Sequence, residues 1–102
     1  MAVSRARIPI PRDRLADFCL RNHVRRLALF GSVLRDDFTP ASDVDVLVEF
    51  EPGRTPGFRL FDKQEELCGI LGRRVDLKTP QELSKYFRDE VLAEAEDVYV
   101  AA

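Results

Sequence analysis

Sulfur and imidazole ligands are scarce in this 102-residue sequence. It contains two cysteines, Cys19 and Cys68, and a single histidine, His23. There is no CxxC pair and no Cys/His cluster, which argues against a zinc site. Both cysteines fall on the apolar faces of expected helices, so we expect two buried free thiols; the sequence alone leaves a disulfide between them open.

The sequence also lacks a long apolar run and an excess of charge of one sign. No stretch is long enough to span a membrane and no signal-peptide pattern is present, so we expect a cytoplasmic protein. The 16 basic residues nearly balance the 18 acidic ones, which argues against a strongly basic surface and hence against a nucleic-acid partner. The length fits one domain, which we expect to span residues 1–102.

The spacing of the apolar residues predicts helices that alternate with strands. Helical spacing or helix-end signals occur in four segments and strand-like alternation or short apolar runs in four others. The expected helices cover residues 11–22, 32–37 (one or two turns), 60–71 and 80–95 (with a break near Ser84), and the expected strands cover 26–30, 43–50, 74–78 and 97–100. This order predicts an α/β sheet layered on helices.

The expected strand 43–50 has one apolar face and one mainly acidic face. Its valines and Phe50 alternate with Asp43, Asp45, Leu47 and Glu49. Asp43 and Asp45 would stand on the same side of the strand, roughly 7 Å apart. Two such carboxylates repel each other, and a divalent cation removes that cost. Magnesium prefers these hard oxygen ligands, so the pattern indicates a metal site on this face, with the other face in the core.

Asp76 repeats this arrangement in the expected strand 74–78, where its neighbours Val75 and Leu77 face the core. If the two strands are neighbours in the sheet, Asp43, Asp45 and Asp76 converge on one patch. Three carboxylates can hold two metal ions about 4 Å apart, the arrangement that serves nucleotidyl transfer.

Gly31 and Ser32 follow the expected strand 26–30. A glycine at this point lets the backbone approach a phosphate closely. The residues after it can begin a helix whose free N–H groups attract anions, and the Ser32 hydroxyl adds a donor. The pair therefore predicts a phosphate-binding turn.

These motifs together resemble a known family. The segment Leu29-Phe30-Gly31-Ser32, followed after ten residues by Asp43-Val44-Asp45, resembles the signature of the polymerase-β-like nucleotidyltransferase superfamily. Asp76 is similar to the third carboxylate of that superfamily. From about residue 11 to its end, the chain resembles the minimal nucleotidyltransferase (MNT) proteins that are encoded beside HEPN-domain partners and are often antitoxins of toxin–antitoxin pairs.

The resemblance implies a nucleotidyltransferase fold, with a short mixed β-sheet and helices packed mainly on one face. It implies a magnesium-dependent enzyme that transfers AMP from ATP to a tyrosine of a HEPN toxin partner (AMPylation). The implied catalytic and metal-binding residues, for two Mg²⁺ ions, are Asp43, Asp45 and Asp76. The implied nucleotide-binding residues are Gly31, Ser32 and Arg35.

Alternatives remain beside this interpretation. Arg35 could bind phosphate or pair with Asp36 or Asp37, and Lys78 could contact the substrate or guard a strand edge. The protein could be a non-catalytic antitoxin that acts by binding, or a transferase that modifies RNA or a small-molecule hydroxyl. The complete set of three acids argues against an idle site but leaves inhibition by binding open. A minimal domain lacks the extra domain that usually holds an RNA or small-molecule acceptor, and the absence of a basic stripe also argues against RNA. The aromatic residues Phe18, Phe61 and Phe87 are expected in the core.

Overall fold

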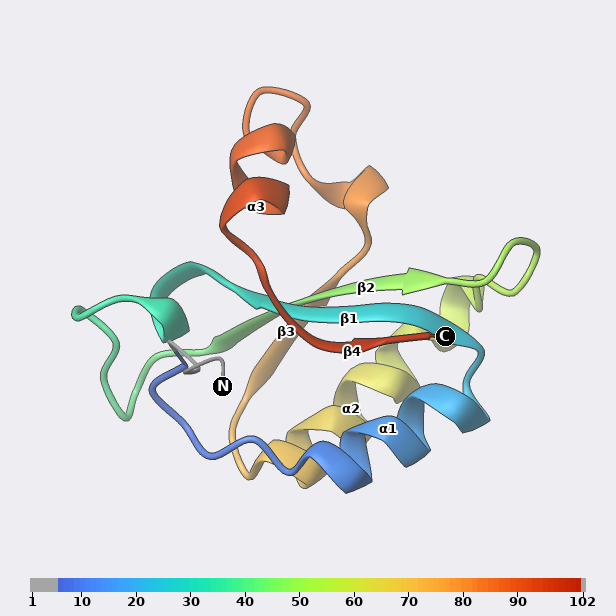
Figure 1. Ribbon diagram of the computed structural model, residues 1–102, viewed down its shortest axis with the longest axis horizontal. Helices are drawn as coiled ribbons and strands as arrows, with labels where there is room; N and C mark the ends of the chain where they lie inside the picture. The colour runs from blue at the N-terminus through green and yellow to red at the C-terminus, as the bar shows by residue number, and fades with distance from the viewer. Residues whose placement is uncertain (1–5, 102) are drawn as a thin grey trace.

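The computed structural model describes residues 6–101, which form a four-stranded mixed sheet with helices on both faces (Figure 1). The elements in chain order are α1 (Arg12–Arg21), β1 (Val24–Phe30), the 3₁₀ turn η1 (Gly31–Leu34), β2 (Val44–Phe50), η2 (Gly57–Arg59), α2 (Leu60–Leu71), β3 (Val75–Lys78), η3 (Pro80–Glu82), α3 (Arg88–Glu94) and β4 (Glu96–Val100). The strand order is β3-β2-β1-β4. The β2–β3 pair is parallel and the other two pairs are antiparallel, which confirms the predicted short mixed sheet.

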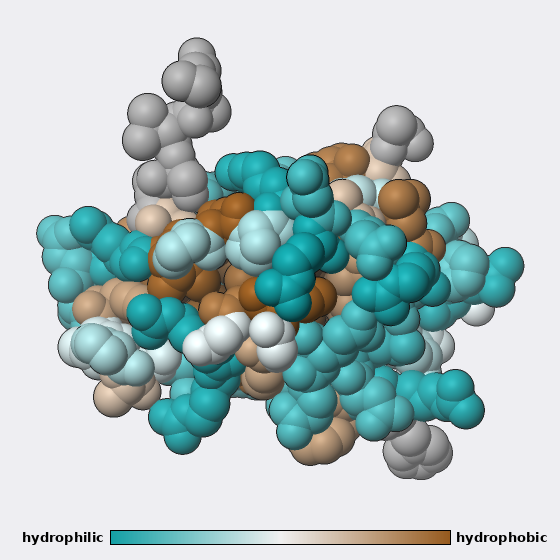
Figure 2. All heavy atoms as spheres, turned by 90° about the horizontal axis from the view of Figure 1, so that it is seen from below, coloured by the Kyte–Doolittle hydropathy of each residue, from teal (hydrophilic) through white to brown (hydrophobic). Residues whose placement is uncertain are grey.

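Helices α1 and α2 lie side by side against one face of the sheet (Figure 1). The valines of β2 on that face are fully buried, and they join one hydrophobic cluster with Phe18 of α1 and Leu67 of α2. This confirms the predicted apolar face of β2. Hydrophilic side chains dominate the outer surface on this side of the molecule, with smaller apolar patches between them (Figure 2).

Helix α3 and the segment before it stand over the opposite face of the sheet (Figure 1). There, Ala28, Phe30 and Leu47 are buried beneath a small apolar cluster contributed by residues 83–95. The acidic face of β2 is therefore covered at Leu47 and is not open along its whole length. Although Leu47 lies between two acidic positions, burying its apolar side chain beneath a helix stabilises the fold more than exposing it to water.

The expected last helix is interrupted. Thr79 and Glu82 form a capping box at the start of this segment, but it begins only η3, because Leu83 takes an extended conformation. The α-helix itself begins at Arg88, so the break extends from Leu83 to Phe87 and is longer than predicted.

Within the described residues, no helix is long and apolar enough to cross a membrane.

Two of the three expected core phenylalanines are not in the core. Phe18 is buried, but Phe61 and Phe87 are more than half exposed. Phe61 lies at the start of α2 outside the face that carries Leu67, and Phe87 precedes α3. Helical spacing alone was therefore a poor guide at the two helix starts.

Both cysteines are free thiols, as predicted. Cys19 is buried, and burial raises the pKa of its thiol to about 12. Cys68 is only partly buried, and its Sγ accepts a hydrogen bond from the N–H of Val75 at 3.3 Å. That bond and a second one, from the Leu77 N–H to Gln64 Oε1 at 3.0 Å, tie the outer edge of β3 to α2.

Candidate active site

The predicted acids lie close together on the α3 side of the sheet. Asp45 pairs in register with Phe30 of β1 on one side and with Asp76 of β3 on the other. Residues that pair in register on neighbouring strands point to the same face. Asp43 directly precedes β2 and is two residues from Asp45. The strands of Asp45 and Asp76 are therefore neighbours, which is the condition that the sequence argument required.

The negative charge of Asp45 is destabilised by its surroundings. Burial raises the pKa of its carboxyl above the ordinary value, and the negative charges of Asp76 and Asp43 raise it further, while Lys78 and Arg35 act in the opposite direction. A negative charge at Asp45 is therefore unfavourable in the folded chain, and a cation placed beside it would relieve that cost.

Asp43 and Asp76 each pair with a basic side chain. Arg74 Nε lies 3.0 Å from Asp43 Oδ1, and Lys78 Nζ lies 3.5 Å from Asp76 Oδ1. The side chains of Asp43 and Asp76 are 51% and 44% exposed, so both pairs are in contact with water and are weak.

The three acids share a neighbourhood without converging on one point. Among the described residues, no three His, Cys, Asp or Glu side chains are arranged to hold a metal ion. Their chemistry nevertheless fits a divalent cation, because they offer hard oxygen donors and one partly buried carboxyl whose charge is poorly compensated. Closing such a site would require Asp43 and Asp76 to leave their basic partners.

Gly31 is required by the position of the Asp45 carboxylate. Its φ angle is +77°, and a Cβ at this position would lie 2.3 Å from Asp45 Oδ2. A side chain at this position would force the Asp45 carboxylate to move, and the positive φ also favours glycine. Gly31, which the sequence predicts beside a phosphate, thus lies directly against Asp45, the central acid of the three.

A cavity of about 310 Å³ opens beside Asp45. Phe30, Gly31 and Arg35 line it on the sheet side, and α3 together with the residue before it contributes Phe87, Glu90, Val91 and Glu94. The guanidinium of Arg35 lies 3.9 Å from carboxylate oxygens of both Asp37 and Glu94. Such long contacts hold it only weakly. Asp36, the other partner considered for Arg35, instead pairs with Arg7.

Ser32 is placed differently from Gly31. It belongs to η1, which is a single 3₁₀ turn, and its carbonyl accepts a hydrogen bond from the Arg35 N–H at 2.9 Å. Ser32 is not among the residues that line the cavity. The structure therefore brings Gly31 and Arg35 to the cavity beside Asp45, but not Ser32.

The α3 wall of this cavity was missed by the sequence analysis. Phe87, Glu90, Val91 and Glu94 follow the spacing of one helical face. The sequence nevertheless predicts Phe87 in the core, because nothing local shows that α3 crosses the acidic side of the sheet.

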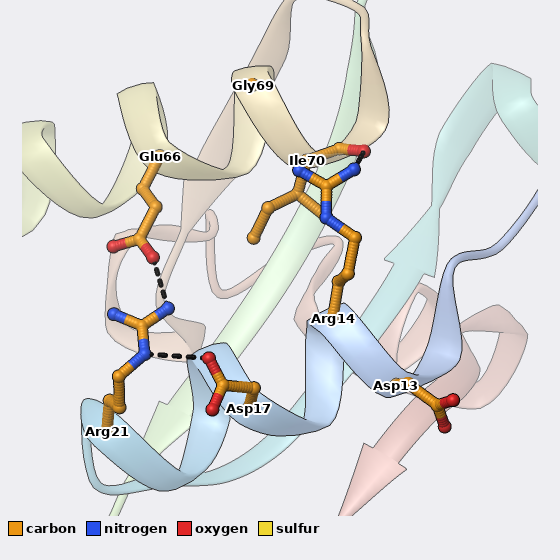
Figure 3. Close-up of a pocket in the computed structure, with 7 residues that line it drawn as sticks. All are labelled: Asp13, Arg14, Asp17, Arg21, Glu66, Gly69 and Ile70. Atoms are coloured by element: carbon orange, nitrogen blue, oxygen red, sulfur yellow. Dashed lines mark hydrogen bonds and ion pairs between the residues drawn. The ribbon is translucent and has the colours of Figure 1, made fainter.

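A second cavity, of about 510 Å³, lies between α1 and α2 (Figure 3). Its charged residues satisfy one another: Arg21 bridges Asp17 at 2.9 Å and Glu66 at 2.5 Å, and Arg14 reaches the Ile70 carbonyl at 3.5 Å. It is larger than the cavity at Asp45 but has no crowded acids and no predicted motif. We therefore assign the candidate site to the cavity at Asp45.

Comparison with known proteins gives concordant results. The family model described as "nucleotidyltransferase domain" matches residues 12–98. A candidate protein adenylyltransferase of Methanocaldococcus jannaschii is 34% identical over 85 residues, which cover 83% of this chain and 90% of the relative. The protein adenylyltransferase MntA of Thermococcus cleftensis is 41% identical over 78 residues, which cover 76% of this chain and 75% of the relative.

Solved structures agree with these sequence matches. A candidate minimal nucleotidyltransferase has a TM-score of 0.70 at 38% identity, covering 83% of this chain and 86% of that one. A tri-AMPylated Shewanella oneidensis HEPN toxin in complex with an MNT antitoxin gives a TM-score of 0.61 at 18% identity, covering 88% and 70% of the two chains. The second likeness shows a common fold alone. From the family match and the identity to its relatives, the chain belongs to the nucleotidyltransferase domain family.

Proposed function

We propose that this protein is an adenylyltransferase that moves AMP from ATP to a hydroxyl group, and that the acceptor is a tyrosine of a HEPN-domain toxin. In this role the protein acts as the antitoxin of the pair. The observation that carries the proposal is the Asp45 carboxylate, which is crowded by Asp76 and Asp43 and lies against a side-chain-free Gly31. The names of the relatives support the reaction, and the solved HEPN–MNT complex supports the partner.

Magnesium is the cation best suited to these acids. Asp43, Asp45 and Asp76 would hold it, as two ions in the full proposal, because carboxylate oxygens are its preferred protein ligands. When bound, it would neutralise charge on the triphosphate and on the attacking oxygen. The raised pKa of Asp45 supports this assignment, because a crowded carboxylate is stabilised by a nearby positive charge.

The charge of the cavity supports metal-dependent nucleotide binding. Its wall carries the carboxylates of Asp45, Glu90 and Glu94 against the single guanidinium of Arg35. A triphosphate entering this cavity alone would meet a net negative field, so we expect weak ATP binding without a divalent cation.

The chain's own residues would position the substrates. Gly31 leaves room for a phosphate to approach the backbone beside Asp45, and Arg35 would leave its long contacts to pair with phosphate oxygens. Asp76, half exposed at the edge of the sheet, would take the proton of the acceptor hydroxyl. The acceptor oxygen then attacks the α-phosphorus in line and pyrophosphate leaves, so positioning supplies much of the acceleration. A Ser32 contact to phosphate remains part of the proposal as a weaker element.

A labelled-nucleotide assay tests this function. The protein and the HEPN protein encoded beside it are purified together and incubated with ATP labelled at the α- or the γ-phosphate. We expect label on the partner from α-labelled ATP only, and only when magnesium is present. Label from the γ-position would indicate phosphoryl transfer, and absence of label from both would argue against an enzyme that acts on this partner.

A further inference from the structure

Phe87 is a large aromatic residue without a place in the hydrophobic core. It is 60% exposed and belongs to neither buried cluster of the described residues. Val91, one helical turn further on, packs against the buried cluster of Ala28, Phe30 and Leu47. Phe87 nevertheless lines the cavity that contains Gly31 and Asp45. Packing therefore does not explain this aromatic ring, whereas a ligand in the cavity would.

The backbone that presents Phe87 is braced by hydrogen bonds. The Phe87 N–H donates to the Ser84 carbonyl at 3.0 Å. The guanidinium of the next residue, Arg88, donates to the carbonyls of Pro80 at 2.8 Å and Leu83 at 3.1 Å. The ring thus stands on an ordered turn, and a ligand that stacks on it would lose little free energy to ordering the chain.

The two walls of the cavity differ in chemistry. Asp45, Gly31 and Arg35 provide charge and close backbone approach, whereas the α3 wall carries the apolar surface of Phe87 and Val91 beside two carboxylates of α3. A nucleoside triphosphate likewise combines charged phosphates with a flat base. Bases stack on aromatic rings with little regard to sequence, because every base has a π-face.

We propose that Phe87 is the nucleobase platform of this cavity, stacking on the base of ATP while the phosphates lie toward Gly31 and Arg35. The inference rests on the proposed function, because it assigns the other end of the same nucleotide. Stacking of this kind supplies affinity and position rather than choice of base.

The test compares two ligands that share only their phosphates. ATP and inorganic tripolyphosphate are titrated, with magnesium present, into wild-type protein and into Phe87→Ala and Phe87→Trp. Tyr86→Ala is the matched control, because Tyr86 is the neighbouring aromatic, is 79% exposed and does not line the cavity. Thermal melts verify that each variant is folded.

We expect Phe87→Ala to weaken ATP binding by about 5- to 150-fold, the usual loss for one stacked base. Tripolyphosphate binding should be unchanged, and Phe87→Trp and Tyr86→Ala should bind ATP like the wild type. Unchanged ATP affinity in Phe87→Ala would overturn the platform and leave the proposed function intact. An equal loss in Tyr86→Ala, or an equal loss of tripolyphosphate binding, would also overturn it.

Two further outcomes bear on the same inference. If Phe87→Ala keeps its ATP affinity but no longer associates with the HEPN protein, the ring belongs to a protein interface and the platform is wrong. If the wild type binds tripolyphosphate but not ATP, the platform and the proposed function fail together.

Discussion

The cavity between α1 and α2 and the cavity at Asp45 differ in how their charges are balanced. In the larger cavity, Arg21 lies between Asp17 and Glu66, and all three side chains have oppositely charged partners. In the smaller one, Asp45 is crowded by other acids and its pKa is raised by burial and by their charge. A folded chain retains an unfavourable charge mainly where it has a use for it. Unbalanced charge, and not cavity volume, therefore identifies the candidate site.

The largest expected effect is the loss of transfer in Asp45→Asn. The substitution keeps the size of the side chain and removes the central charge, so we expect AMP transfer to fall by about 10²- to 10³-fold. Glu49→Gln is the matched control, because Glu49 lies on the same face of β2 but pairs with Arg25 and Arg26. Equal losses in both variants would mean that the total negative charge of this face, and not Asp45 in particular, supports the reaction.

A second test separates the close approach at Gly31 from its backbone conformation. Gly53 has the same φ of +77° but no heavy atom within 4 Å of an added Cβ. Each alanine variant should lose about 1–2 kcal/mol of stability from the left-handed backbone. Gly31→Ala should in addition displace Asp45, and a shift of about 1 Å costs about 100-fold in rate. Transfer kinetics and thermal melts of the two variants measure this, and equal activity in both would remove the steric role of Gly31.

These contrasts also show what the sequence could predict. Alternation along β2 assigns Asp43 and Asp45 to one face from local residues alone. Asp76 needed one assumption, that β3 lies beside β2, and the register of Asp45 with Asp76 confirms it. The family motif marked the same three acids, together with Gly31.

The rest depended on contacts between distant parts of the chain. Nothing local indicates that α3 crosses the acidic face, or that Phe87 would line the cavity instead of entering the core. The ion pair of Asp43 with Arg74 joins residues far apart in the sequence, and nothing local predicts it. Sequence periodicity gives the face of a side chain, whereas the direction of its charged end depends on its tertiary neighbours.

A third test measures how the charge of Asp45 makes the stability of the folded protein depend on pH. Because the pKa of folded Asp45 is raised, the folded state binds this proton more tightly than the unfolded state. The contribution is favourable at low pH and is lost as the pH rises through the folded pKa. Asp45→Asn should therefore gain stability relative to wild type in metal-free buffer as the pH rises from the ordinary carboxyl pKa through the raised pKa of Asp45. Thermal melts across this range test the sign, and a stability difference that does not change with pH would contradict it.

Magnesium should offset the loss of stability that the charge of Asp45 causes in the wild type. At neutral pH, the added ion should raise the melting temperature of wild-type protein more than that of Asp45→Asn, because binding to the folded state stabilises it. Equal shifts in the two proteins would place the ion away from Asp45.

The smallest effect is expected in the cavity between α1 and α2. Arg21→Gln removes two exposed ion pairs, to Asp17 and Glu66. Exposed pairs of this kind contribute little to stability, and this cavity has no role in the proposed reaction. Melting temperature and AMP transfer should both stay close to wild type. A clear loss of transfer in a folded Arg21→Gln variant would reverse the assignment of the two cavities.

The most direct test of the central claim uses the double variant Asp43→Asn, Asp45→Asn. Its fold should survive, because the changes lie opposite the buried valines of β2. Wild type and variant are each co-expressed with the HEPN partner, and AMP labelling of the partner is measured alongside the growth of the cells. The account predicts that the variant loses both labelling and neutralisation. Labelling at the wild-type level would contradict the assigned site, and full neutralisation without labelling would show that binding alone, and not nucleotidyl transfer, is what this protein does to its partner.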